Sequence, residues 1–421
     1  MAGWLKTYSS MRPSALLILL LVSFAAPAND GNFEFTGHTK LNATSQTYPD
    51  DSAFRALFGS SSLDAQADAR LNVKWRSNGW GFDADYQLVG LHGESIGLGG
   101  DFVNRLPNDN RRLLNLTDVI SDSGDNALLH RLDRLWLGYS SEKTVIRFGR
   151  QALSWGNGLF YAPMDLVNPL DPATIDTEYK AGDDMLYAQY LRESGDDVQS
   201  AAVIRRNTIS GDIESDVATY AVKYHGFAGE LEYDVLLAES YADTVLGLGL
   251  GRSIGGAHWG SDLVVTDTDG DTYVQFVTNL SYSWMMKGKN MSGAVEYHYN
   301  GFGQSDNRYD PLSLAENPEL LARIARGQMF TLGRHYLAGS VMVEMTPLWS
   351  ITPVLLANIG DPSALLQLTT NYSLGDNMTL LGSINMPIGS SGTEFGGIES
   401  RQPGLYLSTG PGVFAQFAWY F

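Results

Sequence analysis

The sequence predicts an all-β protein, a transmembrane antiparallel up-and-down β-barrel of about eighteen strands. Three observations lead to this fold class. Segments with period-two alternation of polar and apolar residues recur from end to end. In these segments one face carries charges while the opposite face is continuously apolar. The connections between segments alternate between long and short. A closed barrel satisfies all three, because it leaves no strand edge unpaired in lipid.

The amino end reads as a cleaved secretory signal peptide, residues 1–28, which leaves 29–421 for the barrel. Lys6 and Arg12 precede an apolar run from Ala15 to Ala26, and small residues follow at Ala26 and Ala28. The run is shorter than the roughly 20 residues that a spanning helix needs. Removing this segment takes away two positive charges, so the net charge falls from −19 to about −21, which argues against a nucleic-acid partner.

Cysteine is absent from the sequence. A disulfide scaffold, thiol catalysis and a thiolate metal site are therefore excluded, and we expect no cofactor and no metal. No other stretch approaches 18 consecutive apolar residues, which excludes a helical membrane protein. The absence of a linker or a shift in composition after the signal favours one continuous architecture.

The first clear hairpin lies at 65–88. Alternate residues from Ala65 to Trp75 are apolar, with Gln66, Asp68, Arg70, Asn72 and Lys74 between them. After the turn "SNG", the stretch from Trp80 to Leu88 repeats the pattern. The stretches "ELEYDVL" and "AVEYHYN" alternate in the same way.

Charged residues at every second position cannot fill a dry core without partners. In a membrane barrel, the charged face of each strand lines a wet lumen and the apolar face contacts lipid. We therefore expect two sets of side chains to point inward. The carboxylates are Asp83, Asp85, Glu230, Glu232, Asp234 and Glu296; the basic residues are Arg70, Lys74, Arg147 and Lys223.

Eighteen strands, a count good to about two, follow from this pattern. Their expected starts are Phe33, Leu63, Trp80, Leu128, Thr144, Met185, Gln199, Asp216, Gly229, Thr244, His258, Thr272, Ser292, Tyr336, Ser350, Ala364, Met378 and Gly412. The long connections all follow odd-numbered strands: Ser45–Ser62, His92–Ala127, Gly158–Asp184, Phe302–His335 and Pro387–Pro411. If both termini are periplasmic, the long loops are extracellular and the short turns periplasmic.

Aromatic residues gather near the short-turn end, as in an interfacial girdle: Trp75, Trp80, Tyr139, Tyr224, Tyr233, Tyr282, Trp284, Trp349, Tyr372 and Trp419. The chain closes on "FAQFAWYF", with Gln416 opposite an apolar face. This ending resembles the last strand of Gram-negative outer-membrane barrels, whose terminal aromatic, here Phe421, is read by the barrel-insertion machinery. The resemblance implies an outer-membrane location, in contact with lipid and lipopolysaccharide. A soluble β-sandwich or β-propeller is the alternative.

The segment Ile146–Asp184 resembles porin-like barrels, including poorly characterised families and the alginate-export type. The matching residues are Gly149, Arg150, Gln151, Ser154, Trp155, Gly156, Asn168, Pro169 and Asp171. The resemblance implies that the loop after the fifth strand folds into the barrel and narrows it. We expect Arg147 and Arg150 beside this loop, and Asp165, Asp171, Asp176 and Glu178 across from strand-borne basic residues. Alternatively, these carboxylates solvate a surface loop.

Three further segments are informative. Asn317, Pro318 and Gly327 predict a short helix with Leu320, Leu321 and Ile324 as its apolar side, packed on the barrel rim. The stretch Thr266–Tyr273 matches a calcium loop poorly and is expected to be a hairpin turn. His298, Asn300 and Ser305 match a phospholipase-like site poorly, so the protein is not expected to be an enzyme.

The leading functional hypothesis is a porin-like channel for passive diffusion of small hydrophilic or amphipathic solutes. An alternative is a component for export or uptake of hydrophobic or polymeric material with inner-membrane partners. A structural barrel with a closed lumen is third. The sequence leaves open whether the barrel is a homotrimer or a monomer.

Overall fold

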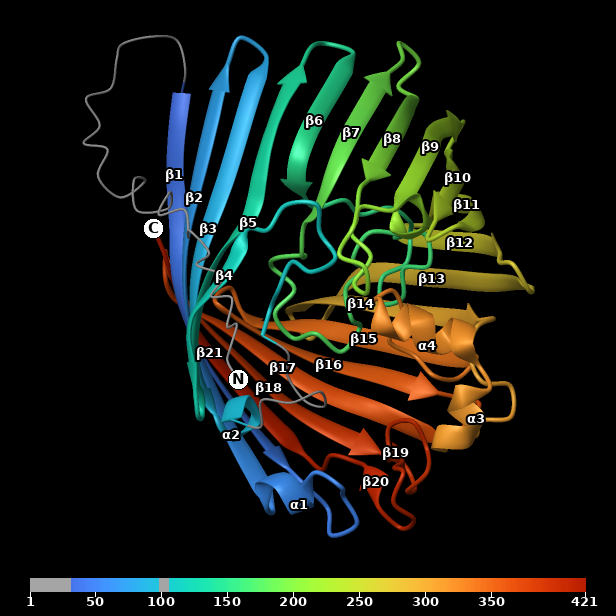
Figure 1. The fold of residues 1–421 in the computed structure, drawn as a ribbon. Coiled ribbons are helices and arrows are strands. Elements are labelled where there is room, and N and C mark those ends of the chain that lie inside the picture. Colours follow the sequence, from blue (N-terminus) through green and yellow to red (C-terminus); the bar gives the residue numbers. More distant parts are fainter. Residues whose placement is uncertain (1–31, 98–105) are drawn as a thin grey trace, which may run out of the picture.

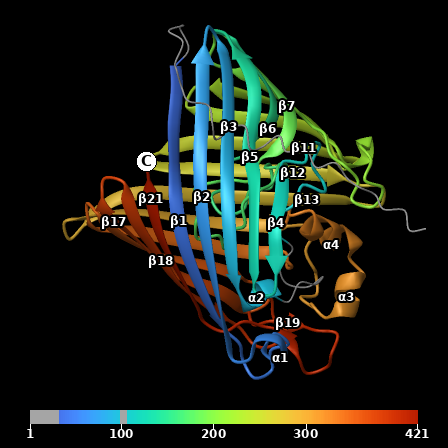
Figure 2. The same cartoon turned by 60° about the vertical axis from the view of Figure 1, so that its left-hand side comes forward.

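The computed structural model describes residues 32–97 and 106–421, so the expected signal peptide lies outside the described residues. The described chain forms a closed, antiparallel barrel of 18 strands (Figures 1 and 2). The wall strands of the first half are β1 (Asn32–Thr47), β2 (Ser61–Ser77), β3 (Trp80–Gly93), β5 (Asn126–Ser140), β6 (Thr144–Gln151), β7 (Asp183–Leu191), β8 (Asp197–Val203), β9 (Thr219–Ala228) and β10 (Leu231–Ser240). Those of the second half are β11 (Asp243–Ile254), β12 (Ala257–Asp267), β13 (Thr272–Met286), β14 (Lys289–Asn300), β15 (His335–Thr346), β16 (Trp349–Asn358), β17 (Ser363–Gly375), β18 (Met378–Ile388) and β21 (Gly412–Tyr420). The predicted fold class is confirmed.

Neighbouring wall strands are neighbours in sequence, and the last strand closes the ring on the first. β21 pairs with β1 from His38 opposite Tyr420 to Gln46 opposite Gly412. Its other edge pairs with β18. Closure provides a hydrogen-bond partner along both edges of every wall strand, which a bilayer requires.

One end of the barrel carries short turns and the other carries the longer connections; we call them the turn end and the loop end. Several turns at the turn end are two residues long, as at Asn78–Gly79 and Lys287–Gly288. All four of these residues have positive φ, between 49° and 82°. Such turns match the right-handed twist of paired strands. The stretch Thr266–Tyr273, which matches a calcium loop poorly, contains the hairpin connection between β12 and β13, as predicted.

The two faces of each strand differ in exposure, as the alternation predicts. On β10, Val235 and Leu237 are about half exposed, whereas Asp234 and Leu236 are buried. On β21, Val413 and Trp419 are exposed and Gln416 is buried, and Phe421, directly after this strand, is exposed as well. An apolar face that is exposed on an isolated barrel is the face that lipid covers. No helix in the described ranges is long and apolar enough to span a bilayer.

Helix α4 (Pro318–Ala325) confirms the predicted helix, and Asn317 accepts a hydrogen bond from the amide of Leu320 at 3.2 Å. Its apolar side is narrower than predicted, because Leu320 is buried while Leu321 is exposed. Other short elements were not predicted: α1 (Arg55–Phe58), α2 (Glu94–Gly97), α3 (Pro311–Ala315), β4 (Thr117–Ser123), β19 (Ile398–Glu399) and β20 (Tyr406–Leu407). β4 pairs with β5 over Asn126–Arg131, beyond the part of β5 that pairs with β6.

Candidate functional site

Residues 152–182, between β6 and β7, contain no regular secondary structure and run through the interior of the barrel (Figure 1). We call this segment the inner loop. Its residues bond to inward-facing side chains on strands from several parts of the wall, among them β1, β12, β14 and β17. A surface loop would make none of these contacts.

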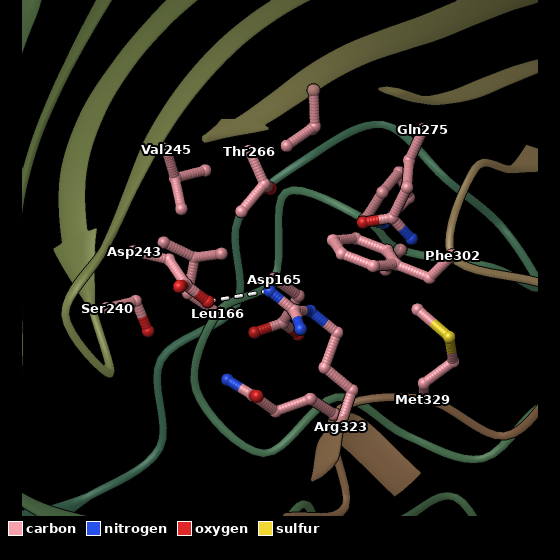
Figure 3. Close-up of a pocket in the computed structure, with 14 residues that line it drawn as sticks. Asp165, Leu166, Ser240, Asp243, Val245, Thr266, Gln275, Phe302, Arg323 and Met329 are labelled. Carbon is pink, nitrogen blue, oxygen red and sulfur yellow. Dashed lines mark hydrogen bonds and ion pairs between the residues drawn. The ribbon is translucent and has the colours of Figure 1, made fainter. Parts of the chain in front are cut away.

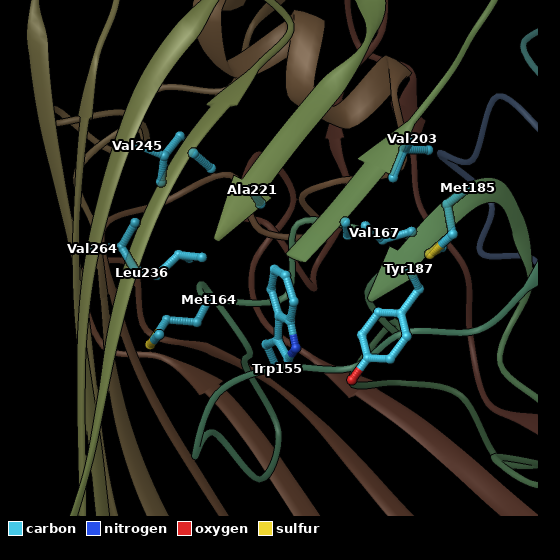
Figure 4. Close-up of a cluster of buried hydrophobic side chains, with 12 residues drawn as sticks. Trp155, Met164, Val167, Met185, Tyr187, Val203, Ala221, Leu236, Val245 and Val264 are labelled. Atoms are coloured by element: carbon cyan, nitrogen blue, oxygen red, sulfur yellow. The ribbon is translucent and has the colours of Figure 1, made fainter. Parts of the chain in front are cut away.

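An apolar cluster fixes the inner loop to the wall formed by β7–β12 (Figure 4). Trp155, Met164 and Val167 of the loop pack on inward-facing wall residues: Met185, Tyr187, Ala201, Val203, Ala221, Leu236, Ala238, Val245 and Val264. The indole Nε1 of Trp155 also donates to Gln199 Oε1 at 2.7 Å. Fully burying one side chain of this size is worth about 1.5–3 kcal/mol, so the cluster holds the loop firmly. This part of the interior is filled by apolar side chains.

Glycines on the inner face of β11 and β12 let the loop approach the wall closely. A Cβ on Gly249 would lie 2.8 Å from Asn157 Nδ2, and one on Gly260 would lie 3.1 Å from Asn157 Cβ. In the space that the glycines leave, the backbone amide and the side-chain amide of Asn157 each donate to Asp262 at 2.7 Å. The alternating glycines of "VLGLGLG" were the sequence signal for this site, and sequence reasoning missed it.

The carboxylate of Glu296 on β14 anchors the inner loop on another wall. It accepts hydrogen bonds from three successive backbone amides, those of Leu159 at 2.5 Å, Phe160 at 3.0 Å and Tyr161 at 2.7 Å. Asn279 Nδ2 supplies a fourth at 3.1 Å. Glu296 is almost fully buried. It faces inward, and its oxygens accept hydrogen bonds from the loop and from Asn279 of β13.

Lys40 on β1 receives the far side of the inner loop. Its Nζ lies 2.7 Å from Asp176 Oδ2 and 2.6 Å from Glu178 Oε2. Gln416 and Tyr420 of β21 donate to the same two carboxylates at 2.8 and 2.9 Å. Burial raises the pKa of Asp176, but the hydrogen bonds from Lys40 and Gln416 outweigh it, so the net pKa is lowered. Lys40 was not among the predicted basic residues, although it lies on the polar face of its strand.

The other two loop carboxylates correct the prediction that all four face strand-borne basic residues. Asp165 pairs with Lys180 of the same loop. Burial raises the pKa of Asp165 to about 6 despite this lysine, and burial also lowers the pKa of Lys180. Asp171 accepts from the backbone amide of Ala173 at 2.8 Å and has no basic partner among the described residues; burial raises its pKa.

The predicted basic residues do not oppose the loop carboxylates either. Arg70 lies 2.5 Å from Asp133 and 3.3 Å from Asp85, and its guanidinium stacks 3.9 Å from the ring centre of Tyr179 in the inner loop. Lys74 lies 3.7 Å from Glu34. Lys223 pairs with Asp234 at 3.0 Å, and Arg147 lies 4.9 Å from the ring of Trp136. The ion pairs join wall residues to one another. The loop is contacted through aromatic rings: Arg70 lies over Tyr179, and Lys223 Nζ lies 6.0 Å from the ring centre of Trp155.

Arg150 lies beside the end of the inner loop, where a Cβ on Gly182 would be 3.0 Å from Arg150 Cγ. It follows Gly149, whose φ of 122° interrupts the regular alternation of side chains at the end of β6. It is buried there, bonded to Asp184 at 2.9 Å and to Asp109 at 3.0 Å. Strand alternation alone cannot reveal this, because the covering segment at 106–116 is distant in sequence.

The remaining predicted carboxylates are distributed along the wall. Asp83 pairs with Arg76 at 2.5 Å, and Glu230 lies in the turn before β10 and pairs with Arg252 at 3.0 Å. Glu232 is exposed near the turn end. His298 and Asn300 share the inward face of β14, but His298 is buried and stacked 4.8 Å from the ring of Tyr161, while Ser305 lies in the following connection.

A small cavity lies between the inner loop and helix α4 (Figure 3). Arg323 of α4 reaches Asp243 at 2.6 Å, and its guanidinium lies 3.8 Å from the ring centre of Phe302. Asp165 and Leu166 of the inner loop line the same cavity. The helix therefore covers the loop-end side of the inner loop.

No protein-family model matches the sequence, and no curated protein sequence matches it. Solved structures do match. Acinetobacter baumannii OccAB4 is similar over 94% of this chain and 100% of that chain, with 10% identity and a TM-score of 0.54. Two further structures are similar to a comparable degree: A. baumannii OccAB1 (93% of this chain and 97% of that chain, 9% identity, TM-score 0.52) and OccAB2 (93% and 98%, 10% identity, TM-score 0.51). At these identities the likeness establishes a shared barrel fold.

Proposed function

We propose that the protein is a porin-like channel of the outer membrane, through which small hydrophilic or amphipathic solutes diffuse passively, and that the inner loop narrows it. The observation that carries the proposal is the attachment of the inner loop to several walls of the barrel interior, through Asn157 on β12, Glu296 on β14 and Lys40 on β1. A loop held across the interior sets the width of any path through it.

Charge on this path determines ionic preference. The chain has a net charge of −19, and Asp171 in the inner loop has no basic partner within the described ranges. Carboxylates along a pore attract cations and repel anions. The channel is therefore mildly cation-selective in this proposal.

Location and assembly belong to the same proposal. Cleavage after residue 28 delivers the chain for insertion, the terminal strand with Phe421 is read by the insertion machinery, and the exposed apolar face contacts lipid and lipopolysaccharide. Monomer and homotrimer both remain compatible with this arrangement.

Recording the purified protein in planar bilayers tests the proposal. Stable conductance steps are expected, with a reversal potential in a salt gradient that indicates cation preference. Silence at several voltages would show a closed lumen and would overturn the channel.

A variant of the inner loop tests whether this loop sets the ionic selectivity. The double substitution Asp176→Asn/Glu178→Gln leaves the Lys40 ammonium without its two carboxylates, so the reversal potential shifts towards anions. Asp306→Asn, an exposed carboxylate in the connection after β14, is the matched control and leaves the reversal potential unchanged. An identical reversal potential in the double variant would place the loop outside the conducting path.

A further inference from the structure

Four arginines converge on a cavity of about 440 Å³ at the loop end of the barrel. Arg111 and Arg112 come from the segment before β4, Arg205 follows β8, and Arg326 ends helix α4. Asn108, Asn110, Asn168 and Thr208 add hydrogen-bonding groups, and Asp183 is the one carboxylate among the described lining residues. In a chain of strongly negative net charge, this cavity is a local concentration of positive charge.

Among the residues that the structure describes, two of these arginines form no ion pair with a carboxylate. Asp183 pairs with Arg205 at 3.0 Å and Asp109 pairs with Arg112 at 2.7 Å. Arg111 instead donates to the backbone oxygen of Ala325 at 2.6 Å. Within the described residues, the side chain of Arg326 contacts only an aromatic ring, that of Tyr241, at 4.2 Å. Two guanidinium groups in the cavity are therefore without an ion pair in the described part of the chain, although the carboxylates of Asp243 and Glu319 lie near enough to Arg326 to interact with its charge.

The backbone around the cavity adopts an unfavourable conformation that positions these groups. Tyr241 and Ala242 form the two-residue connection between β10 and β11 with φ of 55° and 66°, although neither is glycine or asparagine. This turn holds the Tyr241 ring between Arg205 at 4.9 Å and Arg326 at 4.2 Å. Asn168 of the inner loop also lines the cavity and has a φ of 51°.

We propose that this cavity, the arginine pocket, binds the oxyanion group, carboxylate or phosphate, of a small solute at the loop end of the barrel. Guanidinium groups match the geometry of carboxylate and phosphate and bind them through charge-assisted hydrogen bonds. A cavity lined by one sign of charge also concentrates the field and raises the local concentration of the opposite ion. Binding here does not require the barrel to conduct, so the inference extends beyond the proposed channel.

Isothermal titration calorimetry of the folded protein in detergent, with inorganic phosphate and with succinate as probes, tests the pocket. Saturable binding of at least one probe is expected. Arg326→Gln removes a guanidinium that has no ion pair among the described residues and weakens binding by about tenfold or more, since a hydrogen bond to a charged group is worth roughly 1.5–3 kcal/mol. Arg308→Gln, an exposed arginine in the connection after β14, is the matched control and retains wild-type affinity.

Two outcomes overturn the pocket: no saturable binding of either probe by the wild-type protein, or equal weakening by Arg326→Gln and Arg308→Gln. Heat-modifiable mobility on gels shows whether each variant is folded. If Arg326→Gln fails this check, Arg111→Gln replaces it with the same expectation.

Adding lipopolysaccharide at matched phosphate concentration identifies the source of the oxyanion. Displacement of the probe assigns the pocket to a lipid headgroup and overturns the small-solute assignment, whereas unchanged binding supports a soluble ligand.

Discussion

At the scale of single residues, Glu296 shows how one buried carboxylate can fix a loop without regular structure. It satisfies the amides of three consecutive residues, which otherwise would have no partner in the barrel interior. Charged acceptors of this kind form stronger hydrogen bonds than neutral ones. The sequence predicted only that Glu296 points into the lumen. In the structure, its carboxylate also holds the inner loop in place.

Replacing Glu296 with glutamine is therefore expected to loosen the inner loop. A glutamine side chain has one oxygen acceptor and introduces new donors, so at least one loop amide loses its partner, at about 1–3 kcal/mol for each unsatisfied group. The urea midpoint falls and protease cleavage within 152–182 becomes faster. Glu344→Gln, on the inward face of β15 near the turn end, is the control; equal effects of the two substitutions would refute the anchoring role.

Asp165 makes the inner loop sensitive to pH. Burial raises its pKa from 3.8 to about 6, so its contribution to stability is present below pH 3.8 and is lost as the pH rises through about 6. Between pH 4 and pH 7 the wild-type protein should lose up to about 3 kcal/mol relative to Asp165→Asn, which does not titrate. Urea unfolding of both proteins at the two pH values measures this. A difference between the proteins that is independent of pH would contradict the assignment.

At the scale of elements, the inner loop and the wall strands were predictable to different degrees. Wall strands such as β2 and β10 were predictable because alternation is local and one face meets lipid. Helix α4 was predictable from its cap, Asn317. The partners of the inner loop were not, because Lys40 and Glu296 lie more than a hundred residues from the groups they bind. The ion pair of Arg150 with Asp109 was not predictable either, because the two residues are 41 positions apart and no local pattern links them.

The close approach of Asn157 to Gly260 provides a direct test of where the inner loop lies. The chain contains no cysteine, so the pair Asn157→Cys/Gly260→Cys is the only thiol pair in that variant. The Cβ separation of 3.1 Å is slightly below the usual range for a disulfide, which is about 3.5–4.5 Å, so a small shift allows the bond. Oxidation should cross-link the pair, detected as altered mobility of the unfolded protein on non-reducing gels. The pair Asn157→Cys/Gly138→Cys, with its second cysteine on β5, should not cross-link, and the reverse result would place the loop elsewhere.

At the scale of the whole molecule, closure of the barrel depends on its last strand. Phe421 exchanges backbone hydrogen bonds with Gly37, at 2.8 and 3.0 Å. Its ring occupies the space beside Gly37, where a Cβ would meet ring carbon Cζ at 2.6 Å. A glycine at position 37 makes room for this ring, and any larger residue would collide with it. The carboxyl terminus thus belongs to the seam between β21 and β1.

Deleting Phe421, or replacing it with a charged residue, is expected to impair insertion while synthesis and export continue. The deletion removes the two backbone hydrogen bonds between Phe421 and Gly37, and it removes the aromatic ring at the end of the apolar face. Heat-modifiable mobility of the membrane fraction measures the folded barrel, and Phe421→Tyr serves as the conservative control. Wild-type amounts of folded barrel after the deletion would contradict this prediction.

The central claim is that the inner loop narrows an open channel. Single-channel conductance in planar bilayers, compared between the wild-type protein and a variant lacking residues 163–177, tests it most directly. This deletion removes Asp176 and its contact with Lys40 but leaves the Asn157 and Glu296 anchors in the chain. The account predicts stable wild-type steps and a clearly larger conductance in the variant. Equal conductance in a folded variant would show that the loop does not limit the pore.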